Sequence, residues 1–269
     1  WLEIIKRYGS YPVIFCLCGE VNSFLTPLPK ILNFLLYPYL VKRRLDKWNE
    51  VAEFIVKKDK KRHPLTVHVG MDTTAKKLFP RASWLAINTI QSGHSYQTIP
   101  SMVNTIRENK GLPIIDMEPY YEGIKGDFDD FDIRYAFWAC ILSGAKGHSY
   151  GAHGLWQMSK EGENFMKHWG SSNWQKARNF AGALQLGKAK KFLEKTNWKL
   201  LVTREDIITP GRTDKRAHLP IAASSKTEVL IRVNPVGIAP ASKVCFGISL
   251  CGIFSKSLFS LNLKTIDCL

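Results

Sequence analysis

Several signals that would assign this chain to a common class are missing from its sequence. Six cysteines occur at positions 16, 18, 140, 245, 251 and 268. They contain no C-x-x-C pair and no zinc-like spacing, so they give no evidence for a zinc site or a disulfide framework. The first residues contain no signal peptide and no apolar run of about 18 residues. Because the chain begins inside a helix- or strand-like segment, we expect a fragment that lacks its N-terminus. The absence of a targeting signal is therefore not informative.

Acidic residues are few, since 23 Asp and Glu stand against 38 Lys and Arg and leave a net charge of +15. The basic residues cluster at 57–63, 188–195 and 212–216. Such clusters can attract nucleic acid, membranes or acidic polysaccharide. They are also typical of solvated helix ends, which the helix dipole favours for lysine, and we prefer this interpretation. No nucleic-acid-binding motif accompanies the charge, so nucleic acid is only a weak alternative.

Signals for β-hairpins are few, and short apolar runs instead alternate with helical patterns. The predicted strands are YPVIFCLCGEV (11–21), LTVHVG (65–70), WLAINTI (84–90) and LPIIDM (112–117), with a strand and loop in GHSYGAHGLW (147–156). Apolar runs of this length bounded by Gly and Pro are typical of buried strands. Their alternation with helices predicts parallel β/α units.

Three helical patterns separate these strands. The first follows a stretch with three prolines and has four apolar residues spaced to share one face: Leu45, Trp48, Ala52 and Ile55. The others cover residues 99–109 and 131–143. Asp129 or Asp130 is predicted to cap the start of the last helix.

Polar or titratable residues stand at or near the end of each predicted strand. They are Glu20, His68, the group from Gln91 to His94, Glu118, and His148 with Tyr150. In a (β/α)8 barrel the functional groups lie at the carboxyl ends of the strands. We therefore predict an α/β fold, namely a partial (β/α)8 TIM barrel with strands 4–8 present, followed by the start of a small C-terminal β domain.

The two glutamates Glu20 and Glu118 end strands that are separated by two others. Retaining glycosidases place two carboxyl groups about 5–5.5 Å apart, and inverting ones about 6.5–9.5 Å apart. A large group of barrel glycosidases has its acid/base at the end of strand 4 and its nucleophile at the end of strand 7, which the strand count fits. The alternative is that both glutamates form unrelated structural ion pairs.

The chain resembles the apiosidase-like glycoside hydrolases over roughly residues 5–235. The similar segments are YGSYPVIFCLCGEV, HPLTVHVG, IQSGH, PIIDMEPYYEG, IRYAFWACILSGAKGHSYGAHGLW and a later W…ITPG. That family has a barrel followed by a small β domain labelled as collagen-binding. The resemblance implies a secreted or periplasmic enzyme that hydrolyses plant or microbial polysaccharide, with the branched sugar apiose as one known substrate.

The resemblance assigns Glu118 as the nucleophile and Glu20 as the acid/base, where the family often has Asp. Seven further residues fall in matching motifs that line the cleft: His94, Tyr121, Arg134, His148, Tyr150, His153 and Trp156. We add His68, because a histidine can hydrogen-bond sugar hydroxyls, although each histidine can equally be structural. We expect no metal and no cofactor.

The chemistry of the two carboxyl groups sets what should surround them. A donor such as Arg134 or a histidine should hold the ionised carboxylate of Glu118. An apolar strand end and the negative charge of Glu118 should keep Glu20 protonated. Glu122 could contact substrate or simply pair with Lys125, and we favour structural support.

Three regions are predicted along the chain. Residues 1–210 form the C-terminal part of the barrel domain, 211–235 begin a small β-sandwich with TEVLIRV as a strand, and 236–269 form an atypical apolar tail, best explained by a frameshift or read-through. Because strands 1–3 are missing, inactivity of this fragment stays open, and the assigned function belongs to the parent protein more securely than to this chain. The alternative function is a non-catalytic or degenerate carbohydrate-binding barrel protein.

Overall fold

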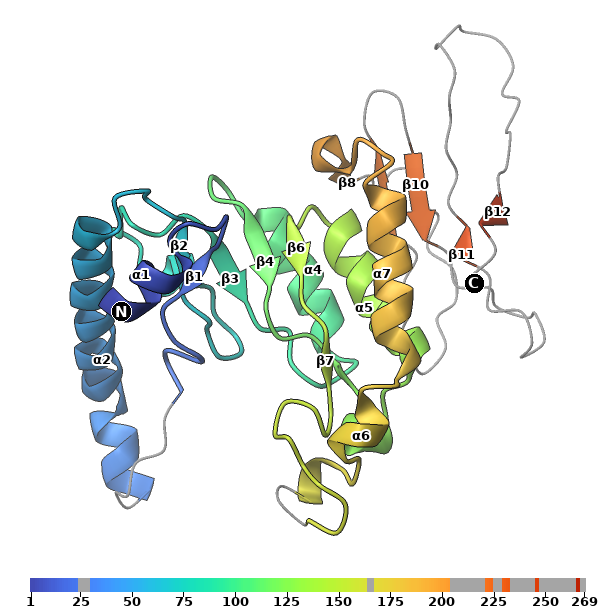
Figure 1. Ribbon diagram of the computed structural model, residues 1–269, viewed down its shortest axis with the longest axis horizontal. Helices are drawn as coiled ribbons and strands as arrows, with labels where there is room; N and C mark the ends of the chain where they lie inside the picture. Colours follow the sequence, from blue (N-terminus) through green and yellow to red (C-terminus); the bar gives the residue numbers. More distant parts are fainter. Residues whose placement is uncertain are drawn as a thin grey trace, which may run out of the picture. The chain divides into compact units, whose positions relative to one another are not determined.

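The computed structural model describes residues 1–23, 30–163, 167–203, 221–224, 229–232, 245–246 and 265–266. The chain forms two compact units (Figure 1). The first comprises Trp1–Ser92 and Asn109–Met117, and the second comprises Gly93–Glu108 and Glu118–Leu269. The predicted strand ends are therefore divided between the units, with Glu20 and His68 in the first and Glu118 and His148 in the second.

The first unit contains parallel strands in chain order. β1 (Phe15–Cys16) pairs with β2 (Leu65–Thr66), and β3 (Asn88–Ile90) pairs with β4 (Ile114–Asp116), both in parallel. A parallel bridge between Leu65 and Leu85 joins the two pairs. The predicted parallel arrangement is confirmed in this unit, and two segments lie between the first strand and the fourth.

Backbone hydrogen bonds extend the pairing of β1 and β2 beyond their ends. The N–H of His68 donates to the carbonyl oxygen of Cys18 at 3.0 Å, and the N–H of Val21 donates to the carbonyl oxygen of His68 at 2.9 Å. Glu20 and His68 therefore lie near the carboxyl ends of neighbouring segments, as the sequence predicts.

The long helix α2 (Lys30–Lys58) belongs to the core of the first unit through its predicted face. All four predicted residues lie in or against this core: Leu45, Trp48, Ala52 and Ile55. The helix begins earlier than expected and continues through Pro38. A proline inside a helix costs about 3 kcal/mol, because it removes a donor and crowds the preceding turn. We attribute the continuation of the helix to the packing of its C-terminal half. Two shorter helices described in this unit are α1 (Leu2–Tyr8) and α3 (Ala75–Leu78).

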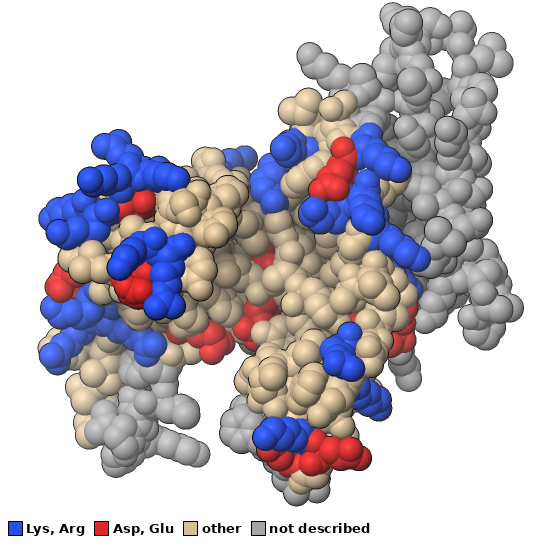
Figure 2. Space-filling view, viewed as in Figure 1, with Lys and Arg blue, Asp and Glu red and all other residues tan. Residues whose placement is uncertain are grey.

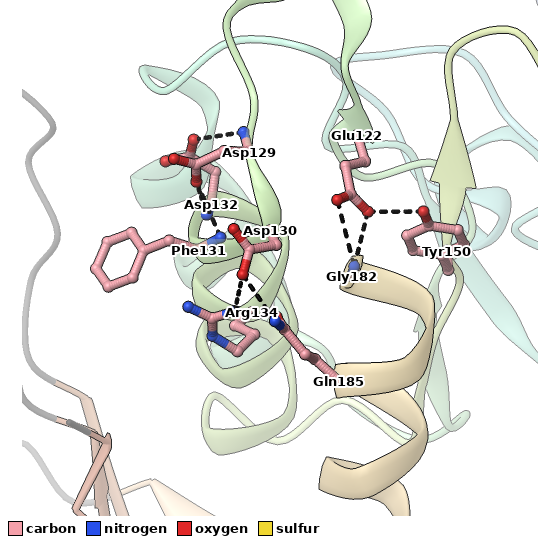
Figure 3. Close-up of polar contacts among 9 residues, drawn as sticks. All are labelled: Glu122, Asp129, Asp130, Phe131, Asp132, Arg134, Tyr150, Gly182 and Gln185. Atoms are coloured by element: carbon pink, nitrogen blue, oxygen red, sulfur yellow. Dashed lines mark hydrogen bonds and ion pairs between the residues drawn. The ribbon is translucent and has the colours of Figure 1, made fainter. Parts of the chain in front are cut away.

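The second unit confirms the two later predicted helices and adds a third. These are α4 (Thr98–Glu108), α5 (Asp130–Leu142) and α7 (Ala181–Leu193). Asp129 caps α5 in a capping box, in which its carboxylate accepts the N–H of Asp132 at 3.2 Å and the carboxylate of Asp132 accepts the N–H of Asp129 at 3.0 Å (Figure 3). α5 contacts both α4 and α7 and is buried on nearly all sides, as its apolar sequence requires.

The strands of the second unit are short. β5 (Tyr121–Glu122) pairs in parallel with β7 (Gly151–Ala152), and β6 (Gly147–His148) precedes β7 within the segment 147–156 that was predicted as a strand and loop. β8 (Val202–Thr203), β9 (Ile221–Ser224) and β10 (Val229–Arg232) form an antiparallel sheet in the order β10-β9-β8. β10 confirms the strand predicted in TEVLIRV.

Much of the predicted C-terminal region lies outside the described residues. Within 236–269 the structure describes β11 (Cys245–Phe246) and β12 (Thr265–Ile266), which pair antiparallel. The β-sandwich and the origin of the tail stay predictions. The remaining short elements are η1 (Ile124–Gly126), η2 (Lys167–Trp169), α6 (Trp174–Ala177) and η3 (Trp198–Leu200).

Two of the three basic clusters lie at helix ends. Lys57 and Lys58 stand in the last turn of α2, and Lys190 and Lys191 stand in the last turn of α7. Figure 2 shows Lys and Arg side chains gathered over each of these helices. This agrees with the preferred interpretation, because positive charge is favourable at a helix C-terminus. The cluster at 212–216 lies outside the described residues.

Two further findings concern disulfide bonds and membrane-spanning helices. Among the described residues, Cys16, Cys18 and Cys140 do not form disulfide bonds. In the part of the chain that the structure describes, no helix has both the length and the apolar character of a membrane span.

Candidate active site

The register of β3 and β4 determines which groups meet beyond the ends of these strands. Ile90 lies opposite Asp116, and beyond these residues the N–H of Gly93 donates to the carbonyl oxygen of Glu118 at 2.9 Å. The buried carboxylate of Asp116 also accepts the hydroxyl of Ser92 at 2.6 Å. The loops that follow both strands are therefore fixed by hydrogen bonds.

Glu118 and His94, on these two loops, lie within ion-pair distance of each other. Nε2 of His94 lies 3.3 Å from Oε1 of Glu118, and the two side chains are only 10% and 16% exposed. Nδ1 of His94 is buried and has no hydrogen-bond partner among the described residues. A histidine that carries its hydrogen on Nε2 therefore fits this arrangement best. Of the two kinds of donor expected for Glu118, the histidine is the one observed.

Aromatic rings surround this pair. The ring of His94 lies 4.5 Å from that of Tyr121 and 5.7 Å from that of Trp169, measured between centroids. Tyr121 in turn lies 6.5 Å from Trp156, which is 46% exposed. Amphipathic aromatic side chains supply apolar area together with polar edges. The structure thus brings together Glu118, His94, Tyr121 and Trp156 from the predicted set.

The glycine at the partner position of β7 explains how Tyr121 is held. Tyr121 pairs with Gly151, and a Cβ added at Gly151 would lie 2.1 Å from Cδ1 of Tyr121. The tyrosine ring therefore packs directly on the glycine backbone. A larger residue at position 151 would displace the ring that contacts His94.

Glu122, the next residue on β5, supports the structure instead of pairing with Lys125. Its buried carboxylate accepts the hydroxyl of Tyr150 at 2.7 Å and the N–H of Gly182 at 3.0 Å (Figure 3). Gly182 lies in the first turn of α7, whose N-cap, Phe180, makes no side-chain cap. Glu122 therefore provides the negative charge and the acceptor that a helix N-terminus favours. The role is structural, as we favoured, but the partners are Tyr150 and Gly182 and not the expected Lys125.

The environment of Glu122 and Tyr150 shifts both groups toward their protonated forms. Burial raises the pKa of Glu122, although the hydrogen bonds from Tyr150 and Gly182 act in the opposite direction. Burial, and next the hydrogen bond to Glu122, raise the pKa of Tyr150 above its ordinary value. Tyr150, which the sequence assigns to substrate, therefore stays a hydroxyl donor to Glu122 at neutral pH.

Arg134 is engaged elsewhere. Its Nη1 lies 2.5 Å from Oδ2 of Asp130 and also donates to Oε1 of Gln185, while Nε2 of Gln185 donates to Asp130 at 2.7 Å (Figure 3). These contacts join α5 to α7. The guanidinium contacts that the structure describes are therefore with α5 and α7, and a role for Arg134 beside Glu118 stays a prediction.

His148 and His153 have different surroundings. His148 as a residue is partly exposed, but both its ring nitrogens are buried without a partner in the described part of the chain, and its ring lies edge-on to Phe137 at 5.4 Å. Burial lowers the pKa of His148 to about 3. His153 is 1% exposed and contacts Nε2 of Gln157 through Nδ1 at 3.2 Å. The surroundings of both residues are typical of structural histidines. A substrate role for His148 or His153 stays a prediction.

Glu20 lies in the first unit and differs from expectation in one respect. Its side chain is exposed and its φ is 31°, so the apolar surrounding expected for an acid catalyst is not present around it. The pairing of Glu20 with Glu118 and the substrate role of His68 stay predictions. Among the described residues, no three His, Cys, Asp or Glu side chains are grouped as metal ligands.

Sequence reasoning missed Trp169. No local sequence pattern identifies Trp169 as a site residue, because its contact with His94 depends on how η2 packs against η1. The sequence suggests a role for Lys125 only as a partner for Glu122. Its Nζ instead lies 4.9 Å from the centroid of the Trp169 ring.

Two solved glycoside hydrolase structures resemble this chain in fold. A solved structure described as a glycoside hydrolase has a TM-score of 0.61 and 24% identity, and the match covers 71% of this chain and 48% of that one. A glycoside hydrolase family 5 structure from Bacteroides vulgatus gives a TM-score of 0.60 and 23% identity, over 68% of this chain and 44% of that one. At these identities the likeness concerns the fold, and it supports a partial barrel of the glycoside hydrolase type. The chain spans about half the length of these structures.

No match was found among curated proteins. The family described as "Apiosidase-like, catalytic domain" matches residues 2–199. This match includes both predicted carboxylates and every residue of the aromatic group around Glu118. The chain therefore belongs to the Apiosidase-like catalytic domain family of glycoside hydrolases.

Proposed function

We propose that this protein is a retaining glycoside hydrolase of plant or microbial polysaccharide, with Glu118 as its nucleophile. The observation that supports this most is the carboxylate of Glu118, which is largely buried and lies 3.3 Å from His94, whose ring in turn contacts Tyr121 and Trp169. A carboxylate that must attack carbon has to be ionised and oriented, and a histidine N–H donor favours both.

The reaction follows the two-carboxylate scheme. An oxygen of Glu118 forms a bond to the anomeric carbon while the bond to the leaving oxygen breaks, and Glu20 gives its proton to that oxygen. The carboxylate of Glu20 then takes a proton from water, whose oxygen displaces Glu118 from the sugar. This scheme requires the two carboxyl groups to be about 5–5.5 Å apart. It needs no metal and no cofactor.

The setting of the reaction comes from the family resemblance. The substrate is an oligosaccharide or polysaccharide, and the enzyme acts outside the cytoplasm, secreted or in the periplasm. Nucleic acid and membranes are not proposed as partners.

A second candidate function is a non-catalytic or degenerate carbohydrate-binding protein. The exposed side chain of Glu20 favours it, because an acid catalyst is normally kept protonated by burial or by a nearby negative charge. In that case the aromatic group would bind sugar, and Glu118 would accept a sugar hydroxyl instead of attacking carbon.

Turnover distinguishes the two functions. The chain and its Glu118→Gln variant are assayed on a panel of aryl glycosides and pectic side-chain oligosaccharides, and the configuration of the released sugar is followed by NMR. We expect release with retained configuration and a loss of about 10³-fold or more in kcat for Glu118→Gln. The exposed Glu194, on the surface beside α7, supplies the control variant Glu194→Gln, which keeps full turnover. Equal rates for all three proteins would exclude Glu118 as nucleophile.

A further inference from the structure

Trp169 is held beside His94, the partner of the candidate nucleophile, by close backbone packing. Gly170 has a φ of 133°, and a Cβ added there would lie 2.8 Å from Cδ2 of His153 and 3.3 Å from the carbonyl oxygen of Gly123. Only glycine fits this position without displacing its neighbours. The segment is therefore pinned against the 123–126 turn, which directs the indole of Trp169 to the ring of His94.

The same turn presents Lys125. Gly123, Lys125 and Gly126 have φ values of 76°, 56° and 75°. The left-handed region is ordinary for glycine but unfavourable for lysine, so the backbone at Lys125 is strained. The lysine is exposed, yet its Nζ is placed 4.9 Å from the centroid of the Trp169 ring.

This pair contributes little to the stability of the fold. A cation–π contact at an exposed site is weak, and it does not exceed the cost of a left-handed lysine. Strain of this kind is common where a side chain must be presented to a ligand. The contact of the indole with His94, which itself contacts Glu118 at 3.3 Å, connects the pair to the reacting group.

We propose that Trp169 and Lys125 form a sugar-binding subsite next to Glu118. The indole stacks on the C–H face of one neutral sugar residue, and the ammonium of Lys125 donates hydrogen bonds to the hydroxyl or ring oxygens of that sugar. This inference rests on the proposed function for the nature of the ligand, but it concerns binding and not the bond-breaking step.

The test therefore measures binding in a protein that does not turn over. The Glu118→Gln variant is run in cationic native gels that contain soluble arabinan, galactan, xyloglucan or arabinoxylan, and the retardation gives an affinity for each. Trp169→Ala and Lys125→Ala are added singly. We expect affinity for at least one polysaccharide, about tenfold weaker with Trp169→Ala and about threefold weaker with Lys125→Ala, at both low and high salt.

Matched controls come from the same unit. Trp198→Ala removes a partly exposed tryptophan of η3, and Lys195→Ala removes an exposed lysine after α7. Neither should change the retardation. If Trp169→Ala does not fold, Lys125→Ala and Trp169→Phe carry the test.

The outcomes separate this subsite from the catalytic proposal. Binding that depends on Trp169 in a chain without turnover supports the subsite even when the hydrolase assignment fails. Affinity that is unchanged in the Trp169 and Lys125 variants overturns the subsite, and so does the absence of retardation on every polysaccharide. Loss of binding at high salt also overturns it, because an anionic group would then be the ligand of Lys125.

Discussion

Oε1 of Glu118 lies 3.3 Å from Nε2 of His94, and both side chains are largely withdrawn from water. The pair forms because β3 and β4 run in parallel, with Ile90 opposite Asp116, so that the loops after both strands begin side by side. The carboxylate of Glu118, which follows β4, is therefore paired with His94 from the segment that follows β3. This relationship connects the fold to the chemistry that we propose.

Replacing His94 should affect the chemical step more than substrate binding. His94→Leu leaves the carboxylate of Glu118 without this donor and removes a ring that packs on Tyr121. We expect kcat to fall about 10²-fold with a smaller change in KM. His94→Gln retains an N–H donor and should recover part of the loss. The measurement is steady-state kinetics of the three proteins on the substrate that the turnover panel identifies, and an unchanged kcat in His94→Leu would contradict the assigned role.

Replacing either of two glycines of α7 by alanine should change the stability of the fold, in opposite directions for the two positions. A Cβ at Gly182 would lie 2.3 Å from Oε2 of Glu122, whereas a Cβ at Gly187 meets nothing within 4 Å. Gly187→Ala should stabilise the protein by about 0.5–1 kcal/mol, the usual gain of alanine in a helix. Gly182→Ala should destabilise it by about 1–3 kcal/mol, as overpacking does. Urea unfolding gives both values.

A double-mutant cycle locates the cause of the Gly182 effect. Glu122→Ala removes the carboxylate that the new methyl group would strike, so adding Gly182→Ala should then cost much less and leave only the tighter contact with Cε2 of Tyr150 at 3.2 Å. Glu122→Ala alone leaves the Gly182 N–H and the Tyr150 hydroxyl without their acceptor, which costs about 1–3 kcal/mol for each buried group. Additive effects in this cycle would place the clash elsewhere.

The buried ring of His148 should make stability depend on pH. The pKa of His148 is lowered from 6.5 to about 3 in the folded protein, so the unfolded chain binds this proton first. The stabilisation is therefore complete above the unfolded value and is lost as the pH falls toward 3, by about 1.4 kcal/mol per pH unit.

His148→Phe removes this dependence while keeping a ring against Phe137. Urea unfolding of the unmodified protein and of this variant between pH 7 and about pH 4 should give a smaller slope for the variant. The exposed His168 supplies the control, since His168→Phe should leave the slope unchanged. Parallel slopes for all three proteins would mean that His148 is protonated in the fold.

Local patterns were enough to predict much of the fold. Apolar runs bounded by Gly and Pro located four parallel segments of the first unit, and Asp129 was correctly placed as the cap of α5. Helix spacing identified the buried face of α2 but not its start, because packing of its C-terminal half overrides the proline at position 38. Propensity describes the isolated segment, whereas the helix boundary depends on the whole core.

The candidate site was harder to predict than the fold. Glu118, His94 and Tyr121 come together because strand ends and register are visible in the sequence. Arg134 pairs within its own helix and with α7, and Trp169 reaches His94 from a distant loop. Both depend on tertiary packing, which one sequence does not encode as a local pattern.

The covalent intermediate provides the most direct test of the central claim. In Glu20→Gln the general base that activates water is missing, so an activated aryl glycoside should leave the sugar bound to the protein. Mass spectrometry of the digested variant is predicted to show the mass of one sugar residue on the peptide that contains Glu118. Turnover with the sugar attached to another residue, or turnover that persists in Glu118→Gln, would contradict the account.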